Sequence, residues 1–508
     1  MRLTILIGGK AGQGINKLSE IVSKVMSDYG YFTFNYRDYP SLIRGGHNFN
    51  VLSISDKRIG SIESKIDIIV ALDKKTVEMH KKELKKSGII LSCEEFCDLG
   101  LNANIALAGA LIKILGVDKK FLIAEVKKQF NSLEASEAAE KGYDSEKEKF
   151  NLKKSQNKLM ILTGNQGISQ GAINSKLDLY FSYPMTPATG VMHELASNQI
   201  KNNLLVFQPE SEISAVNAAL GASFTGSRVM VGTSGGGFDL MTEALSFQGI
   251  SEIPLTVYLA SRPGPGTGVP TYTCQSDLDV ALRAGHGEFP RVVIAPGDPI
   301  ECIEKTNEAL YLAEKFKTLS IILSDKHLAE GEFSTNSKPN KILDVKINRA
   351  IPGKTIVRAS SYEHDEYGNT KEDAETAKIG ADNRIKKYRQ IKKEVENFEM
   401  IKIFGNKNSK NLIIGWGSTK TVVLDAIEGL DCKFLQVLYL KPISDEIRKE
   451  IEKSKNVLLV EQNSTGQLGR LIREKTGIKI EEKNRILKYD SRPFYSDELN
   501  LEIAKRLK

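Results

Sequence analysis

Four short motifs between residues 178 and 290 carry side chains that could bind a ligand or move a proton. They are YPMTP with Thr186, QPESE with Glu210 and Glu212, the glycine run Gly235–Gly237, and RPGPG with Arg262. A carboxylate can hold a proton, a hydroxyl and a guanidinium can hold a carboxylate substrate, and glycines let a backbone approach a ligand closely. These residues could serve one active site if the fold brings the four motifs together.

Each motif directly follows an apolar segment that is predicted to form a β-strand: LDLYF, LLVF, RVMVG and IPLTVYLAS. Helical segments rich in small or apolar residues follow the second and third motifs. Alternating strands and helices predict a parallel sheet. Because open α/β sheets bind ligands beyond the carboxyl ends of their strands, we expect the four loops to converge on one cleft. The two prolines of YPMTP should make the loop around Thr186 stiff.

The same motifs resemble those of a known family. YPMTP is similar to the YPITP signature of the 2-oxoacid:ferredoxin oxidoreductases, QPESE to their acidic pair, and GTSGGGFDLMTEAL to their TSGPGFSLM-type segment. RPGPGTGVPT and GHGEFPR follow in the family's order and spacing. Five motifs in sequence are specific, whereas any one alone would be weak.

The resemblance implies a role for each candidate residue. Glu212 would be the catalytic carboxylate that contacts the aminopyrimidine ring of thiamine diphosphate and makes its amino group basic, with Glu210 in reserve. Thr186 and Arg262 would hold the substrate carboxylate. The implied cofactor-binding set is Tyr183, Pro184, Glu210, Gly235 and Gly236.

Residue chemistry alone leaves simpler interpretations open. A glutamate in the first turn of a helix, such as Glu212, commonly just complements the helix dipole. Thr186 could be a turn hydroxyl, Arg262 a surface charge, and the glycine run a strand-to-helix turn. We assign no chemistry to Gln275, Asp277 or His286, which follow Arg262 in the chain.

Residues 1–131 are predicted to form a Rossmann-like domain. RLTILIGG reads as a strand, Gly9-x-x-Gly12-x-Gly14 as a tight loop, and INKLSEIVSKVMSDYG as an amphipathic helix. Lys17 replaces the third glycine of a dinucleotide-binding fingerprint, so a turn that only packs helix on strand is favoured over nucleotide binding. With the RGGHN segment and ALAGALIKILG, this region resembles the γ subunit of the same family.

The whole chain is predicted to be α/β, with three α/β domains. The central one is expected to be a thiamine diphosphate pyrimidine-binding type doubly wound parallel sheet. The expected boundaries are 1–131 for the γ-like domain, 132–158 for a charged, solvated linker, 159–335 for the pyrimidine-binding domain, 336–407 for a connecting segment, and 408–508 for a transketolase-C-like domain. EHDEYG in the connecting segment is best explained as a solvated turn.

The composition argues against a nucleic-acid-binding protein, a membrane protein and a cysteine-bound metal site. The chain has 508 residues with a net charge of +7 that is scattered along the sequence, which argues against a nucleic-acid footprint. No apolar run approaches the roughly 20 residues of a membrane helix, so we expect a cytoplasmic protein. The five cysteines show no zinc or iron–sulfur spacing.

The chain carries no GDG-type motif for Mg²⁺ and diphosphate. The resemblance therefore implies a β subunit that supplies Mg²⁺, the diphosphate site and a [4Fe–4S] cluster, in a heterodimer or a dimer of heterodimers. The implied reaction is oxidative decarboxylation of a 2-oxo acid, with 2-oxoglutarate favoured: CO₂ leaves, electrons pass to ferredoxin, and the acyl group passes to coenzyme A. Two alternatives remain, a non-catalytic scaffold subunit and a nicotinamide-dependent oxidoreductase.

Overall fold

The computed structural model describes residues 1–40, 46–347 and 349–507, which form two compact units. The division falls inside the last helix, α18 (Ser496–Leu507). The first unit comprises Met1–Thr163, Gly331–Ser337 and Phe494–Leu501, and the second comprises Gly164–Glu330, Lys338–Pro493 and Glu502–Lys508.

The first unit is built on a mixed sheet of seven strands. In spatial order these are β5 (Leu84–Ser92), β4 (Ile66–Ala71), β1 (Arg2–Lys10), β3 (His47–Ser55), β2 (Phe32–Asp38), β13 (Glu332–Thr335) and β6 (Met160–Thr163). β1 lies parallel to β4 but antiparallel to β3. Its helices are α1 (Ile15–Asp28), α2 (Lys74–His80), the 3₁₀ segment η1 (Cys93–Asn102), α3 (Ala103–Ile114), α4 (Lys119–Phe130) and α5 (Leu133–Ser145).

The expected strand, glycine loop and helix at the N-terminus are present as β1 and α1. The interpretation of residues 132–158 as a solvated linker is wrong for its first half. There α5 packs against α3 so closely that a methyl group on Gly142 would lie 1.8 Å from the carbonyl oxygen of Ala106. Small residues build this contact, which is why the segment's low apolar content resembled a linker. The expected boundary at 159 also differs, because β6 joins the first sheet through β13.

One described segment, Cys93–Ile114, is apolar and long enough to span a membrane by length and composition alone. More than half of it is buried, and its backbone is interrupted at Gly100. Both properties are those of a core helix in a folded unit.

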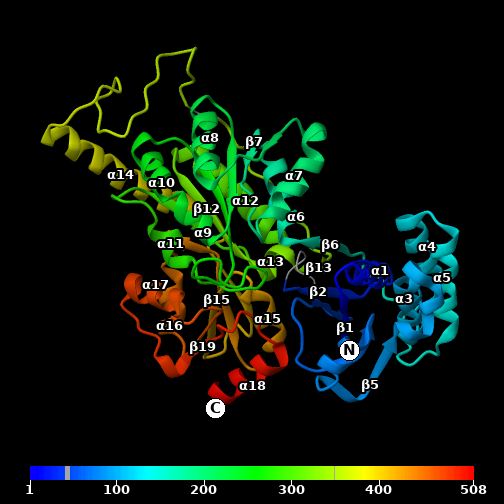
Figure 1. The fold of residues 1–508 in the computed structure, drawn as a ribbon. Coiled ribbons are helices and arrows are strands. Elements are labelled where there is room, and N and C mark those ends of the chain that lie inside the picture. Colours follow the sequence, from blue (N-terminus) through cyan, green and yellow to red (C-terminus); the bar gives the residue numbers. More distant parts are fainter. Residues whose placement is uncertain (41–45, 348, 508) are drawn as a thin grey trace. The chain divides into compact units, whose positions relative to one another are not determined.

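The second unit contains the predicted doubly wound sheet (Figure 1). Its strands in spatial order are β17 (Tyr439–Lys441), β11 (Arg291–Ile294), β12 (Leu319–Asp325), β10 (Leu255–Ser261), β9 (Val229–Thr233), β7 (Leu179–Phe181) and β8 (Leu205–Phe207). All pairs are parallel except that of the edge strand β17. The helices are α6 (Gly164–Asn174), α7 (Thr189–Asn202), α8 (Glu212–Phe224), α9 (Gly235–Leu240), α10 (Thr242–Ser251), α11 (Leu278–Arg283), α12 (Pro299–Phe316) and α13 (Lys326–Glu330).

A second, five-stranded sheet completes this unit. Its strands in spatial order are β14 (Ile401–Gly405), β16 (Lys433–Val437), β15 (Asn411–Trp416), β18 (Asn456–Glu461) and β19 (Arg485–Leu487). Its helices are α15 (Thr419–Ala426), α16 (Glu446–Glu452), α17 (Gln467–Thr476) and the 3₁₀ turn η2 (Glu482–Asn484), whereas the preceding helix α14 (Ala374–Val395) contacts α12 of the central sheet. One hydrophobic core runs through both sheets, so they pack as one body.

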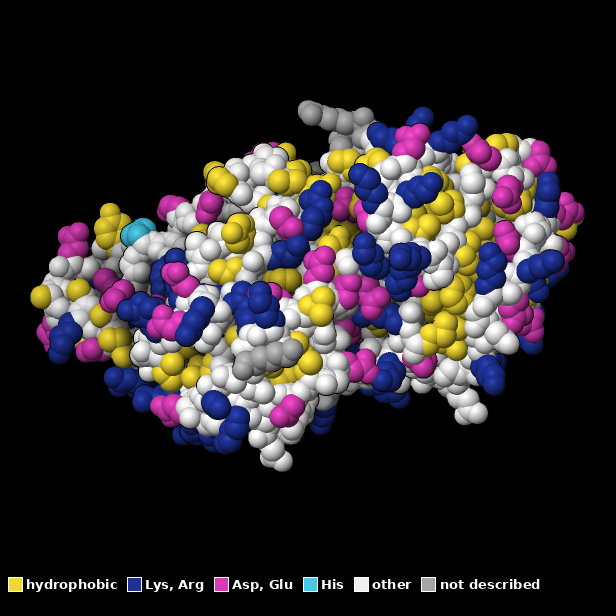
Figure 2. Space-filling model, turned by 90° about the horizontal axis from the view of Figure 1, so that it is seen from below, with side chains coloured by type: hydrophobic (Ala, Val, Ile, Leu, Met, Phe, Trp, Pro, Cys, Tyr) yellow, Lys and Arg dark blue, Asp and Glu magenta, His cyan; other side chains and the backbone are white. Residues whose placement is uncertain are grey.

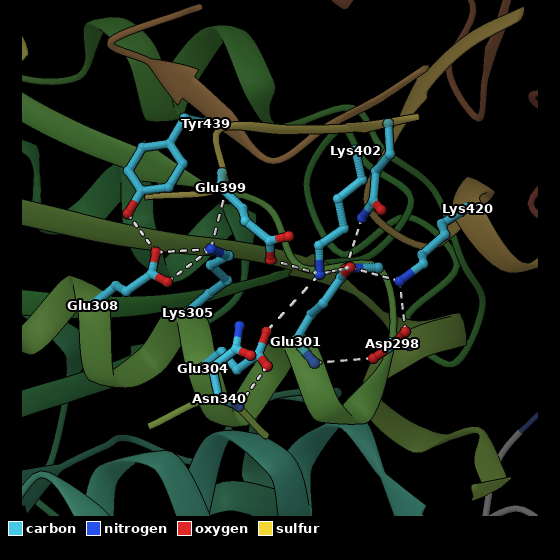
Figure 3. A network of polar contacts seen from close by, with 12 residues as sticks. Asp298, Glu301, Glu304, Lys305, Glu308, Asn340, Glu399, Lys402, Lys420 and Tyr439 are labelled. Carbon is cyan, nitrogen blue, oxygen red and sulfur yellow. Dashed lines mark hydrogen bonds and ion pairs between the residues drawn. The ribbon is translucent and has the colours of Figure 1, made fainter. Parts of the chain in front are cut away.

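Buried ion pairs reinforce this junction along α12 (Figure 3). Lys420 lies 2.6 Å from carboxylate oxygens of both Asp298 and Glu301, and Lys402 lies 3.1 Å from Glu301. Removing one partner of such a buried group would leave an unpaired charge, which typically costs about 3–5 kcal/mol. The network therefore fixes how the central sheet and the C-terminal sheet pack within the second unit.

Surface charge on the face drawn in Figure 2 is mixed, with Lys and Arg side chains interspersed among Asp and Glu. That face carries no extended patch of a single sign.

Candidate active site

Glu212 is a buried carboxylate at the start of a helix. Ser211 caps α8, and its hydroxyl accepts a hydrogen bond from the backbone N–H of Ser214 at 3.2 Å. Glu212 is therefore the first helical residue, where the helix dipole favours a negative charge. Its side chain is only 4% exposed, yet Oε1 has no hydrogen-bond partner. A buried, unpartnered carboxylate oxygen is costly, and this oxygen can accept a hydrogen bond from a donor outside the chain.

The glycine run lies against two acidic side chains. A Cβ atom on Gly237 would be 2.7 Å from Cγ and Oε1 of Glu212, and one on Gly235 would be 2.7 Å from Oδ2 of Asp277. Gly236 is exposed, and a Cβ atom there would have only the carbonyl oxygen of Gly266 within reach, at 4.0 Å. Two of the three glycines, Gly235 and Gly237, therefore let a carboxylate reach the backbone at the start of α9.

Arg262 lies at the carboxyl end of β10 and is held by the YPMTP loop. Its Nη1 donates to the backbone carbonyl oxygen of Thr186 at 3.0 Å. Burial lowers the pKa of Arg262, while the nearby carboxylates of Asp277 and Glu212 oppose this effect. Within the described part of the chain, Arg262 forms no salt bridge, so most donors of its guanidinium stay available to a ligand.

The other predicted site residues lie nearer the surface. Tyr183 is 39% exposed, and Pro184 and Thr186 are half-buried. Glu210 is exposed, and its carboxylate accepts a hydrogen bond from the Ser214 hydroxyl, which lowers the pKa of Glu210. The fold therefore brings together Glu212, the glycine run, Arg262 and Thr186, whereas Glu210 is exposed and bonded to Ser214.

Asp277 is a member of this group to which sequence reasoning assigned no chemistry. It precedes α11 in the N-cap position but makes no capping hydrogen bond. Its Oδ2 is instead buried beside Gly235 without a hydrogen-bond partner, and burial raises the pKa of Asp277. An aspartate before a short helix resembles an ordinary cap in sequence, so only the fold reveals that this one faces the site.

The RGGHN segment and the N-terminal glycine loop of the first unit each contain a residue in close contact with a side chain elsewhere in that unit. The Nε2 atoms of His47 and His80 lie 2.9 Å apart, and burial is the main cause that lowers the pKa of His47. Arg44 and Gly45 of the RGGHN segment lie outside the described residues. Gly14 packs so tightly that a Cβ atom there would lie 2.1 Å from the Asn104 amide nitrogen, which supports a packing role for this loop.

The EHDEYG segment forms a hydrogen-bonded turn. The Asp365 carboxylate accepts from the backbone N–H groups of Tyr367 and Asn369, at 3.0 Å and 2.9 Å. Glu363 pairs with Arg384 at 2.6 Å. Across the described ranges, no group of three or more acidic, histidine or cysteine side chains could hold a metal ion.

Family models place the doubly wound domain in the class of thiamine diphosphate-binding oxidoreductase domains. Residues 170–397 match "Pyruvate flavodoxin/ferredoxin oxidoreductase, thiamine diP-bdg", and residues 4–99 match "Pyruvate ferredoxin/flavodoxin oxidoreductase". The chain belongs to the family of 2-oxoacid:ferredoxin oxidoreductase alpha subunits. It is 31% identical to that subunit of Sulfolobus sp, over 100% of this chain and 97% of the relative.

Other relatives carry a narrower name. The chain is 32% identical to the 2-oxoglutarate oxidoreductase subunit KorA of Mycobacterium tuberculosis, over 60% of this chain and 50% of the relative. The fold is that of a solved 2-oxoglutarate:ferredoxin oxidoreductase from Magnetococcus marinus, which has 2-oxoglutarate, coenzyme A and succinyl-CoA bound. The TM-score is 0.90 with 24% identity, and the match covers 100% of both chains.

Proposed function

We propose that this chain is the cofactor-activating and substrate-positioning subunit of a 2-oxoacid:ferredoxin oxidoreductase that uses coenzyme A and favours 2-oxoglutarate. The observation that carries the proposal is the unpartnered Oε1 of Glu212, buried against the glycine run beside Arg262. Thiamine diphosphate fits this donor set, because its aminopyrimidine ring offers a protonated nitrogen to a carboxylate. When bound, the cofactor supplies the nucleophilic carbon that allows the 2-oxo acid to lose CO₂.

In this proposal each residue has a defined task. Glu212 accepts the hydrogen bond from the ring nitrogen and raises the basicity of the ring's amino group. Arg262 binds the carboxylate of the 2-oxo acid with its free donors while its Nη1 remains on the Thr186 carbonyl oxygen. The Thr186 hydroxyl, on the same loop, adds a hydrogen bond to that carboxylate. Tyr183, Pro184, Gly235 and Gly236 line the approach of the cofactor.

The chain would work with a β subunit that brings Mg²⁺, the diphosphate site and a [4Fe–4S] cluster, and it would pass electrons to ferredoxin in the cytoplasm. The elements that carry the site expose large apolar side chains: Tyr183, Leu205, Phe207, Ile213, Leu240 and Val269 are each 39–52% exposed. Large exposed apolar side chains are a common feature of surfaces that a partner covers, which supports this proposal.

The test is an assay of coenzyme A-dependent dye reduction with a panel of 2-oxo acids. The chain copurified with its partner should reduce a viologen dye, fastest with 2-oxoglutarate, and the chain alone should not. Full activity of the chain alone would refute the shared site, and an assembled complex inactive with every 2-oxo acid would favour the scaffold alternative. Reduction of NAD⁺ by the chain alone would favour the nicotinamide alternative. A preference for pyruvate would correct only the substrate.

A further inference from the structure

Two consecutive carbonyl groups of the YPMTP loop are held by side chains from other elements. Arg262 Nη1 donates to the carbonyl oxygen of Thr186 at 3.0 Å, and Asn165 Nδ2 donates to that of Pro187, also at 3.0 Å. Asn165 is the second residue of α6 and is 6% exposed. The loop is thus fixed at two successive peptide groups, one of them by a residue that lies outside all four motifs.

Asn165 is itself oriented by the strand that precedes Arg262. The Tyr258 hydroxyl in the middle of β10 donates to Asn165 Oδ1 at 2.8 Å, and Tyr258 is fully buried. Burial raises the pKa of Tyr258 well above its ordinary value, so this hydroxyl keeps its proton. We call these two contacts on the YPMTP loop, from Asn165 and from Arg262, the clamp. Both depend on β10, because Tyr258 on this strand orients Asn165 and Arg262 directly follows the strand.

Three contacts favour one orientation of the Asn165 amide. A flipped amide would place Oδ1 against the carbonyl oxygen of Pro187, two acceptors without a proton between them. The backbone of Gly190 also packs against this amide, since a Cβ atom on Gly190 would lie 2.3 Å from Nδ2 of Asn165. An amide fixed in this way determines where the Pro187 carbonyl lies, and with it the neighbouring Thr186.

We propose that Asn165 is a positioning residue for the substrate-carboxylate pocket, acting through Pro187 on Thr186 and Arg262, with Tyr258 as the group that orients it. This role rests on the proposed function of Thr186 and Arg262. Asn165 touches neither the cofactor nor the substrate. Its loss changes how well the 2-oxo acid is held and leaves the activation by Glu212 in place.

The experiment compares three variants in the assembled complex. Tyr258→Phe removes only the orienting hydroxyl, Asn165→Ala removes both hydrogen bonds of the amide but leaves that of Arg262 to Thr186, and Tyr180→Phe is the matched control. Tyr180 is also fully buried, on β7 of the same sheet, and its hydroxyl takes no part in the hydrogen bonds that hold Asn165. Tyr258→Phe and Asn165→Ala should raise KM for the 2-oxo acid roughly five- to thirty-fold, with kcat changed less than about threefold, as expected for one buried hydrogen bond. Tyr180→Phe should keep the wild-type KM.

Two further measurements separate positioning from general damage. Binding of a phosphonate analogue of the 2-oxo acid, followed by the shift in Tm of the complex, should weaken by the same factor as KM rises, while thiamine diphosphate affinity stays within about twofold of wild type. The double variant Asn165→Ala, Tyr258→Phe should cost little more than Asn165→Ala, because Tyr258 acts through Asn165.

Wild-type KM and analogue affinity in Tyr258→Phe would overturn the proposal, as would an equal rise in Tyr180→Phe. If Asn165→Ala does not fold, Tyr258→Phe decides alone. A wild-type complex inactive with 2-oxo acids would instead refute the proposed function, which the same assay reveals before any variant is compared.

Discussion

The side chain of Glu212 lies directly against the backbone of Gly237. A methyl group on Gly237 would come within 2.7 Å of Cγ and Oε1 of Glu212 and within 2.2 Å of Oγ1 of Thr233. Gly237→Ala must therefore displace the carboxylate. We expect kcat of the assembled complex to fall at least roughly tenfold, because a misplacement of about 1 Å in a catalytic group can cost a hundredfold.

Gly221→Ala is the matched control for this prediction. Gly221 lies on α8, the helix that starts with Glu212, and a methyl group there meets nothing within 4 Å. Alanine in a helix interior is about 0.5–1 kcal/mol more favourable than glycine, so this variant should keep its activity and unfold at the same or a higher temperature. Equal kcat in Gly237→Ala and wild type would show that the contact with Glu212 does not matter.

Glu212→Gln tests the catalytic carboxylate itself. The amide keeps the shape of the side chain but cannot accept a proton, so kcat should fall about 10²–10⁴-fold while the complex still assembles. Steady-state kinetics and size-exclusion chromatography measure the two effects. Glu210→Gln is the comparison, because Glu210 is exposed and bonded to Ser214. A larger loss in Glu210→Gln than in Glu212→Gln would reverse the assignment.

Arg262→Lys tests the group that holds the substrate. A lysine cannot keep the hydrogen bond to Thr186 and also present a planar pair of donors to a carboxylate. The KM for the 2-oxo acid should therefore rise about 10- to 100-fold, with a smaller change in kcat, as measured in the dye-reduction assay. Arg283→Lys, on the exposed end of α11, serves as the control. An unchanged KM in Arg262→Lys would remove the guanidinium from the substrate site.

Much of this site could be predicted from sequence because its residues follow strands with a clear apolar pattern. The strand ends placed Thr186, Glu212 and Arg262 on neighbouring loops, and the structure has those loops together. Asn165 and Asp277 could not be found in this way, because their positions depend on contacts with residues distant in the chain. Asn165 contacts Pro187, 22 residues away, and Asp277 lies beside Gly235 at the start of α9.

The same limit explains the misjudged segment after residue 131. Helix α5 packs through small residues such as Ala139 and Gly142, which give little apolar signal in the sequence. Close packing of small residues becomes visible only when the partner helix, α3, is known.

Asp277→Asn should stabilise the chain at neutral pH. Burial raises the pKa of Asp277 above the ordinary carboxyl value of about 4, so the folded state holds the proton more tightly than the unfolded state does. This contribution to stability is present in full below about pH 4 and is lost as the pH rises through the raised pKa. An asparagine keeps the neutral form at every pH, so the Tm of the variant should exceed that of wild type at pH 7 by a few degrees and converge with it toward pH 4. Thermal unfolding between pH 4 and pH 8 measures the difference. If Asp277→Asn instead lowers the Tm at pH 7, then attraction between the ionised carboxylate and Arg262 outweighs the cost of burial, and Asp277 would be a stabilising partner of Arg262.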